Sequence, residues 1–249
     1  MNLKTNSNKW YKDWFNASYY HILYQDRDYS EAQRFIKNLI KVLVPPKNST
    51  IVDIACGKGR HAIQLASLGY QVDGFDLSEN SISEAKKFES SNLKFFINDM
   101  RNPLKEGYYD YAFNLFTSFG YFNDKSENQK ALTAISKSLK PKGSFVLDYL
   151  NANKVISTLP EQEEKLIDGI KFTINKSYLD GNIVKNIKLN DNNVESVYQE
   201  QVEGILLDDF ISLFKTANLS IQSIYGDYDL SNFDEKNSDR LIIVASKNG

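Results

Sequence analysis

A glycine turn between two aspartates is the part of the sequence best suited to chemistry. Residues 50–54 form a short β-branched run that predicts a buried parallel strand, and residues 60–68 predict a helix. Cys56-Gly57-Lys58-Gly59 lies between them. Glycines let a backbone approach a ligand closely, and a helix N-terminus offers free N–H groups. Strand, turn and helix in this order therefore predict a nucleotide site.

The two aspartates help to choose between possible ligands. Residues 57–62 also fit the G-x-G-x-x-G/A fingerprint of NAD(P)-dependent Rossmann oxidoreductases, which is a weak signal on its own. Asp53, four positions before Gly57, would repel a dinucleotide pyrophosphate and could instead face a ligand amine or brace the turn. Asp76 closes the next apolar run, where its carboxylate could accept hydrogen bonds from both hydroxyls of a ribose.

Segments 52–60 and 74–78 resemble the first two motifs of class I S-adenosylmethionine-dependent methyltransferases. The resemblance covers residues 45–150 and 205–247. It implies an α/β fold with a Rossmann-like seven-stranded sheet of order 3-2-1-4-5-7-6, and S-adenosyl-L-methionine as the cofactor. It also implies a set of cofactor contacts. The methionine moiety would be contacted by Asp53, Ala55, Cys56, Gly57 and Gly59, and the ribose and adenine would be contacted by Asp76 and Leu77.

The ends of two further predicted strands supply more candidates. The resemblance implies an acid facing the adenine after strand 93–98, which is Asp99, with Met100 beside it. It also implies that Phe116, which ends strand 109–116, approaches the methionine part of the cofactor. Capping of the following turn is the alternative for Asp99. Tyr121 could border the sulfonium, because aromatic faces attract cations; core packing is its alternative.

Residues 10–29 contain eight aromatic side chains, together with His21 and Arg27. An exposed cluster of this density would promote aggregation, so we expect the segment to fold over the cofactor as a lid. Tyr24 is the predicted cofactor contact, and Arg27 is expected to meet an anionic group. A helix packed away from the site is the alternative. The segment around Tyr24 also resembles the N-terminal part of bacterial sugar-amine N-methyltransferases.

The chain is expected to have three parts: an aromatic lid and helix (1–44), a cofactor-binding core (45–150 and 205–249), and an antiparallel β insert covering the active site (151–204). The Asp180-Gly181 turn between two alternating segments predicts a hairpin, with a third strand at 194–203. The insert leaves the fifth core strand at its carboxyl end, where ligands bind in such sheets. A dimer contact is the alternative role for the insert.

No general base is evident from the sequence. The catalytic candidates are His21, Tyr121 and Tyr149, which lie in the N-terminal segment and near the ends of the fourth and fifth strands. Many transferases need only to orient a deprotonated nucleophile, so a missing base does not exclude catalysis. We predict methyl transfer to a small molecule through an N, O or C atom. A non-catalytic S-adenosylmethionine-binding module and an oxidoreductase are the alternatives.

Composition excludes several other classes. A net charge of −2 with interspersed lysines gives no basic stripe for nucleic acid, and the chain lacks Asn/Asp-Pro-Pro-aromatic after its fourth strand. The single Cys56 excludes a disulfide framework and a cysteine zinc site, and no metal site is predicted. No apolar run reaches membrane-spanning length. We expect a cytoplasmic protein that is a monomer or a homodimer.

Overall fold

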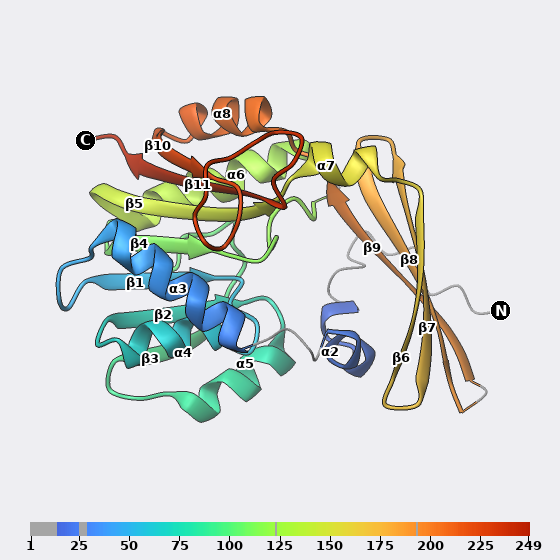
Figure 1. Cartoon of the computed structure of the whole chain (residues 1–249). Coiled ribbons are helices and arrows are strands. Elements are labelled where there is room, and N and C mark those ends of the chain that lie inside the picture. Colours follow the sequence, from blue (N-terminus) through green and yellow to red (C-terminus); the bar gives the residue numbers. More distant parts are fainter. Residues whose placement is uncertain (1–13, 25–28, 123, 193) are drawn as a thin grey trace.

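The computed structural model describes residues 14–24, 29–122, 124–192 and 194–249. Figure 1 shows a large sheet covered by helices, a second sheet to one side, and helix α2 (Ser18–Leu23) between the two. In the described part of the chain, no helix is both long and apolar enough to cross a membrane. The prediction for Arg27 lies outside the described residues.

The large sheet has seven strands in the order β3-β2-β1-β4-β5-β11-β10. Strand β11 is antiparallel to both of its neighbours, and the other pairs are parallel. The predicted order 3-2-1-4-5-7-6 is therefore confirmed. The strands are β1 (Thr50–Ile54), β2 (Gln71–Asp76), β3 (Leu93–Ile97), β4 (Tyr109–Asn114), β5 (Leu139–Leu150), β10 (Leu219–Tyr225) and β11 (Arg240–Lys247).

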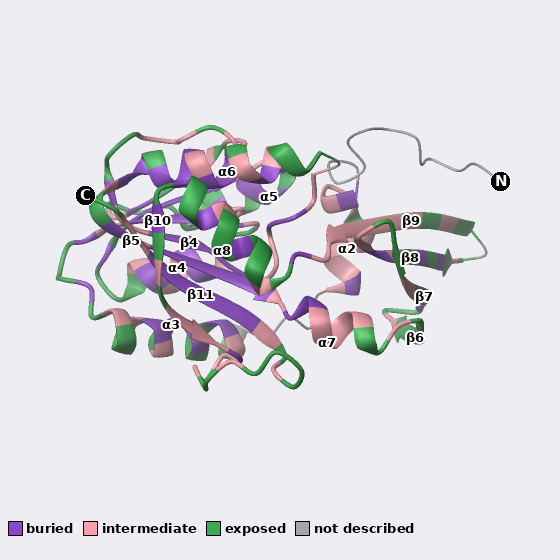
Figure 2. Cartoon of the chain, turned by 90° about the horizontal axis from the view of Figure 1, so that it is seen from above, coloured by how far each residue is buried: buried purple, intermediate pink, exposed green. Residues whose placement is uncertain are grey.

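Successive strand residues point to opposite faces of this sheet, and helices bury both faces. Ile51 packs with helices α3, α4 and α5, whereas Val52 packs with α6 and α8. Figure 2 shows the central strands as buried along most of their length. The helices are α3 (Tyr29–Leu43), α4 (Arg60–Ser67), α5 (Glu79–Ala85), α6 (Lys125–Ser138) and α8 (Leu207–Thr216). Two helical layers thus leave the carboxyl edge of the parallel strands open for a ligand.

The insert is an antiparallel sheet of four strands, β6 (Glu161–Ile167), β7 (Ile170–Leu179), β8 (Asn182–Asp191) and β9 (Val194–Glu203). Asp180 and Gly181 both have positive φ, as the predicted two-residue hairpin requires. Only three strands were predicted. The fourth, β6, contains mostly charged residues and gains its strand conformation by pairing with β7.

Residues 14–24 complete the core of the insert. Trp14 and Leu23 are buried against Phe172 and Ile187, which point from β7 and β8 toward the large sheet. The N-terminal segment therefore lies between the two sheets and contacts the insert through its apolar side chains.

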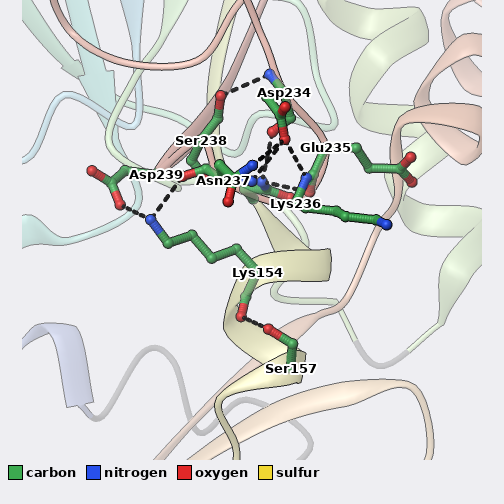
Figure 3. A network of polar contacts seen from close by, with 9 residues as sticks. Lys154, Ser157, Asp234, Glu235, Lys236, Asn237, Ser238 and Asp239 are labelled. Atoms are coloured by element: carbon green, nitrogen blue, oxygen red, sulfur yellow. Dashed lines mark hydrogen bonds and ion pairs between the residues drawn. The ribbon is translucent and has the colours of Figure 1, made fainter.

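A polar loop before β11 is bound by a hydrogen bond and an ion pair to helix α7 (Ala152–Ser157), which leads into the insert. Lys154 Nζ donates to the Asn237 carbonyl at 2.8 Å and pairs with Asp239 at 2.6 Å (Figure 3). Asp234 Oδ1 accepts from the backbone nitrogen of Asn237 at 2.9 Å, which closes the loop on itself. These contacts fix the entry to β11, and hence the position of Arg240, the first residue of that strand.

Candidate active site

A cavity of about 750 Å³ opens at the carboxyl edge of the large sheet and extends beneath the insert. Its lining comes from the glycine turn, the ends of β2 and β3, the loop after β4, the N-terminal segment and the insert. The predicted residues that line it are His21, Tyr24, Ala55, Cys56, Gly57, Asp76, Leu77, Asp99, Met100, Phe116 and Tyr121. Three predicted residues lie outside this lining: Asp53, Gly59 and Tyr149.

Asp76 faces the cavity from the end of β2. Its Oδ2 accepts a hydrogen bond from the Gly57 backbone nitrogen at 2.9 Å, and its Oδ1 accepts from the Ser78 nitrogen at 2.8 Å. Burial raises the pKa of this carboxyl, and the two backbone N–H groups oppose that effect. Each carboxylate oxygen can accept a further hydrogen bond, so Asp76 is suited to hold two neighbouring hydroxyl groups.

The glycine turn uses its two glycines differently. Gly57 and Gly59 both have positive φ, at 55° and 82°. A Cβ added to Gly59 would lie 2.5 Å from the ring of Phe95, whereas one added to Gly57 would meet nothing within 4 Å. Gly59 therefore allows the turn to pack on the core. This position gives no support to the predicted contact between Gly59 and the cofactor. Gly57 keeps the backbone open to the cavity.

Asp53 braces the turn from below. It is 1% exposed, and its Oδ2 accepts a hydrogen bond from the Ala62 backbone nitrogen in the first turn of α4 at 3.1 Å. Burial raises the pKa of Asp53 to about 7, against the opposing effect of that N–H group. Of the two roles considered for Asp53, this geometry supports bracing of the turn and gives no support to a ligand contact.

His61 follows the turn and does line the cavity. Burial, aided by the charge of Arg60, lowers the pKa of His61 to about 3, so its imidazole is neutral at pH 7. Its Nε2 is buried and has no hydrogen-bond partner among the described residues.

The loop after β4 is held in an unusual conformation by a buried ion pair. Phe116 and Thr117 both have positive φ, at 64° and 56°. Asp148, whose side chain is 0% exposed, accepts from the Phe116 nitrogen at 2.7 Å and pairs with Arg240 at 2.7 Å. Arg240 also donates to Thr117 Oγ1 at 2.9 Å. This framework places the Phe116 ring on the cavity wall, with the Arg60 guanidinium 4.3 Å from its centroid.

Asp99 both lines the cavity and caps the following turn. Its Oδ1 accepts from the Arg101 backbone nitrogen at 3.0 Å, and its Oδ2 forms an ion pair with the Arg101 side chain at 2.5 Å. The capping alternative raised from the sequence is thus real, but it leaves the carboxylate at the cavity.

Tyr149 does not face the cavity. It is 0% exposed, and its hydroxyl donates to the Glu203 carbonyl at the end of β9. The geometry therefore supports a structural role that joins β5 to the insert, and the predicted catalytic role has no support. Tyr121 does line the cavity, where it meets Phe15 edge to face at 5.3 Å between ring centroids.

The N-terminal segment closes one side of the cavity. Tyr24 donates from its hydroxyl to Glu200 at 2.8 Å and accepts from Lys185 Nζ at 2.6 Å. Trp14 Nε1 donates to the same Glu200 at 2.6 Å. At the other edge, Asn16 Oδ1 accepts from the Ser78 hydroxyl at 2.6 Å, next to Asp76. Residues 14–24 therefore bridge the insert and the cofactor side of the core.

Several cavity residues were not among the candidates from the sequence. The charged ones include Arg60 and Arg240, together with four residues of the insert, Glu161, Lys176, Lys185 and Glu200. The alternation of side chains along the strands of the insert could have shown which of its residues share a face. It could not have shown that this face covers a cavity.

Comparison with known proteins identifies the fold and the family. Residues 45–208, more than half of the chain, match the family model described as "Methyltransferase domain". The chain belongs to this family. S-adenosyl-L-methionine is the cofactor that the sequence motifs imply for such a domain, and the oxidoreductase alternative is not supported.

Individual relatives agree with this placement. The putative methyltransferase YqeM of Bacillus subtilis (strain 168) is 29% identical over 148 residues, which are 58% of this chain and 58% of the relative. The chain thus spans less than two thirds of the length of the curated relatives that it matches first.

Two solved structures share the fold. An S-adenosylmethionine-dependent methyltransferase from Clostridium acetobutylicum ATCC 824 superposes with a TM-score of 0.77 at 20% identity, covering 93% of this chain and 96% of that one. CalS10 of Micromonospora echinaspora, described as an amino pentose methyltransferase with S-adenosylmethionine bound, gives a TM-score of 0.69 at 17% identity, covering 93% and 97%.

The residues present fit this cofactor. Asp76 offers two acceptor oxygens at the end of β2, and Gly57 leaves the turn open where a side chain would occupy space. The cavity is also within the range that encloses a ligand of this size.

Proposed function

We propose that this protein transfers a methyl group from S-adenosyl-L-methionine to the amine nitrogen of a small-molecule acceptor. The observation that carries the proposal is one continuous cavity, which joins the Asp76 and glycine-turn side of the core to the charged face of the insert. The likeness to CalS10, an amino pentose methyltransferase, supports an amine as the acceptor group. The resemblance of the segment around Tyr24 to sugar-amine N-methyltransferases agrees with it.

Named residues divide the binding of the cofactor. Asp76 would accept hydrogen bonds from the ribose hydroxyls, and the backbone from Ala55 to Gly57 would meet the methionine moiety. Leu77, Asp99 and Met100 would enclose the adenine. When bound, the cofactor supplies a methyl group on a positively charged sulfur, which a nucleophile displaces in line.

Aromatic side chains would favour that chemistry. Phe15, Tyr20, Phe116 and Tyr121 line the cavity. Aromatic faces attract cations, and their bulk excludes water from the reacting groups. In this proposal the residues orient the acceptor and stabilise positive charge, which are the main contributions a protein makes to such a displacement.

His21 is the proposed proton acceptor, and Tyr121 is proposed to border the sulfonium and the acceptor. Both line the cavity, and His21 lies against Tyr20 with ring centroids 5.4 Å apart. A neutral imidazole has one nitrogen that accepts a proton, so His21 can take the proton that the acceptor nitrogen loses. Tyr149 has no part in this step, because its hydroxyl is buried and bonded to a carbonyl.

Calorimetry and turnover test the proposal together. We expect saturable binding of S-adenosylhomocysteine and none of NADH. With methyl-labelled cofactor, we expect label transfer to members of a panel of small amino sugars and not to the matching hydroxy sugars. Binding without transfer to any amine or alcohol would instead support a non-catalytic module. Transfer to the alcohols alone would overturn the choice of nitrogen.

A further inference from the structure

Asp99 is held by a residue of its own turn. Its backbone carbonyl accepts from the Asn102 nitrogen at 2.9 Å, which closes a turn after β3 and brings Arg101 back beside Asp99. Asp99 Oδ1 accepts from the Arg101 backbone nitrogen at 3.0 Å and from Arg101 Nε at 2.9 Å, and Oδ2 pairs with Nη2 at 2.5 Å. The guanidinium thus binds both carboxylate oxygens, which fixes the direction of the carboxylate as well as its place.

Arg101 is itself fixed by two further contacts. Its Nη1 pairs at 2.5 Å with Glu127, which lies in the first turn of α6. Its guanidinium also lies over the Phe122 ring, 5.0 Å from the centroid. The side chains of Asp99, Arg101 and Glu127 are 20%, 29% and 18% exposed, so the group is more enclosed than an ordinary surface pair. Arg101 therefore ties Asp99 to α6 and to the loop after β4.

The members of this group differ in their access to a ligand. Asp99 and Phe122 line the cavity, whereas Arg101 and Glu127 are outside its lining. The carboxylate therefore meets a bound molecule, and the guanidinium that orients the carboxylate does not. Such an arrangement suits a residue that acts through its neighbour.

The orientation of a carboxylate matters when it must distinguish two purines. An ionised carboxylate accepts hydrogen bonds and donates none. Adenine carries an amino donor at position 6, whereas hypoxanthine carries a carbonyl acceptor there and an N–H donor at position 1. A carboxylate held opposite position 6 accepts from the amino group and repels the carbonyl oxygen. One that can swing toward position 1 recovers a hydrogen bond with hypoxanthine, so selection depends on the carboxylate being held.

We propose that Arg101 is a positioning residue that makes the cofactor site select a purine with a 6-amino group, because it holds Asp99 opposite that group. The inference rests on the proposed function, in which Asp99 helps to enclose the adenine of the cofactor. Arg101 makes no contact with the cofactor in this scheme and acts through Asp99 alone.

Calorimetry on the full chain measures the selection, with S-adenosylhomocysteine and S-inosylhomocysteine as the two ligands. They differ only in having a 6-amino or a 6-oxo purine. We expect the wild type to bind S-adenosylhomocysteine at least tenfold more tightly, and Arg101→Met to reduce this ratio at least fivefold. The matched control is Lys130→Met, which removes the other cation paired with Glu127 and should leave the ratio within twofold. A wild-type ratio near one, or an equal fall in the control, overturns the proposal.

The ratio separates positioning from stability, because a damaged site weakens the binding of both ligands alike. Arg101→Lys is the second variant, should Arg101→Met fail to fold. Lysine keeps the charge but lacks the planar fork, so its ratio should also fall at least threefold, and an unchanged ratio overturns the proposal.

A double variant tests whether Arg101 acts through Asp99. In Asp99→Ala the ratio should be near one, and adding Arg101→Met should leave it there; a further change overturns the proposal. Failure of S-adenosylhomocysteine to bind the wild type counts against the proposed function, whereas binding without selection counts against this inference alone.

Discussion

Asp76 Oδ2 lies 2.9 Å from the backbone nitrogen of Gly57, so the carboxylate that faces the cavity also holds the glycine turn in shape. One side chain thereby couples the proposed ribose contact to the backbone that would hold the methionine moiety. Loss of this carboxylate should affect both ends of the proposed cofactor site at once.

Asp76→Ala should weaken binding of S-adenosylhomocysteine at least tenfold. Hydrogen bonds to a charged acceptor contribute about 1.5–3 kcal/mol each, and a tenfold loss needs only about 1.4 kcal/mol. Calorimetry measures the affinity, with Glu79→Ala, an exposed acid in the first turn of α5, as the control. Unchanged affinity in a folded Asp76→Ala protein would remove the ribose assignment.

Asp53→Asn should change how stability depends on pH. The carboxyl of Asp53 has a pKa of about 7 when folded and near 3.8 when unfolded, so the folded state holds more protons between these values. Wild-type stability should therefore fall as the pH rises through this window, relative to the variant, by about 4 kcal/mol at most. His61 titrates in both proteins, so its effect cancels in the difference. Urea unfolding at pH 4.5 and pH 8 measures the stability difference between the wild type and the variant. A stability difference independent of pH would contradict the prediction.

Arg240→Met should destabilise the fold by about 3–5 kcal/mol, because it leaves the buried Asp148 carboxylate without its partner. The matched control is Arg34→Met. Arg34 pairs with Asp229 at 3.6 Å on the surface, with both side chains more than half exposed, so its loss should cost less than about 1 kcal/mol. Urea midpoints of the two variants provide the comparison, and similar midpoints would show that the Asp148–Arg240 pair is not important for stability.

Glu200→Ala should release the N-terminal segment from the insert. The substitution leaves Trp14 Nε1 and Lys185 without the carboxylate that they share. Hydrogen exchange of residues 14–24 should then rise at least tenfold, while exchange in β1 and β4 stays as in the wild type. Glu195→Ala, on the other face of β9, serves as the control and should leave all three regions unchanged.

The same variant tests the proposal that residues 14–24 act as a lid. If they do, Glu200→Ala should also weaken binding of S-adenosylhomocysteine. Faster exchange of the segment with unchanged affinity would show that the segment is a fixed wall of the insert, with no role in holding the cofactor.

The large sheet could be predicted from the sequence, because each of its strands carries its own signal. The short β-branched run of β1, buried on both faces, and the glycine turn after it are local properties. The start of β5 was harder to predict, because Pro141 and Gly143 indicate a turn there. Strand β5 nevertheless begins at Leu139 and continues across a register shift beside β4. Strand β6 could not be predicted from its own residues, because its conformation depends on pairing with β7.

The candidate site could be predicted in part. Asp76 ends its strand at the cavity, as position alone suggests, whereas Asp53 and Tyr149 point into the protein and bond to backbone groups. A residue's place in a strand indicates which edge of the sheet it approaches, but not which neighbour meets its side chain. Arg240 shows the limit most clearly, because it reaches the cavity from the first residue of the last strand.

The contact between Trp14 and Glu200 spans 186 positions of the chain. During synthesis the aromatic side chains at the beginning emerge long before β7, β8 and β9, which later bury them. Contacts of such large sequence separation form slowly, because much chain must be ordered before they are made. The nascent protein therefore carries an exposed aromatic segment until the insert is complete, and this is the interval in which chaperone binding or aggregation of the new chain would begin.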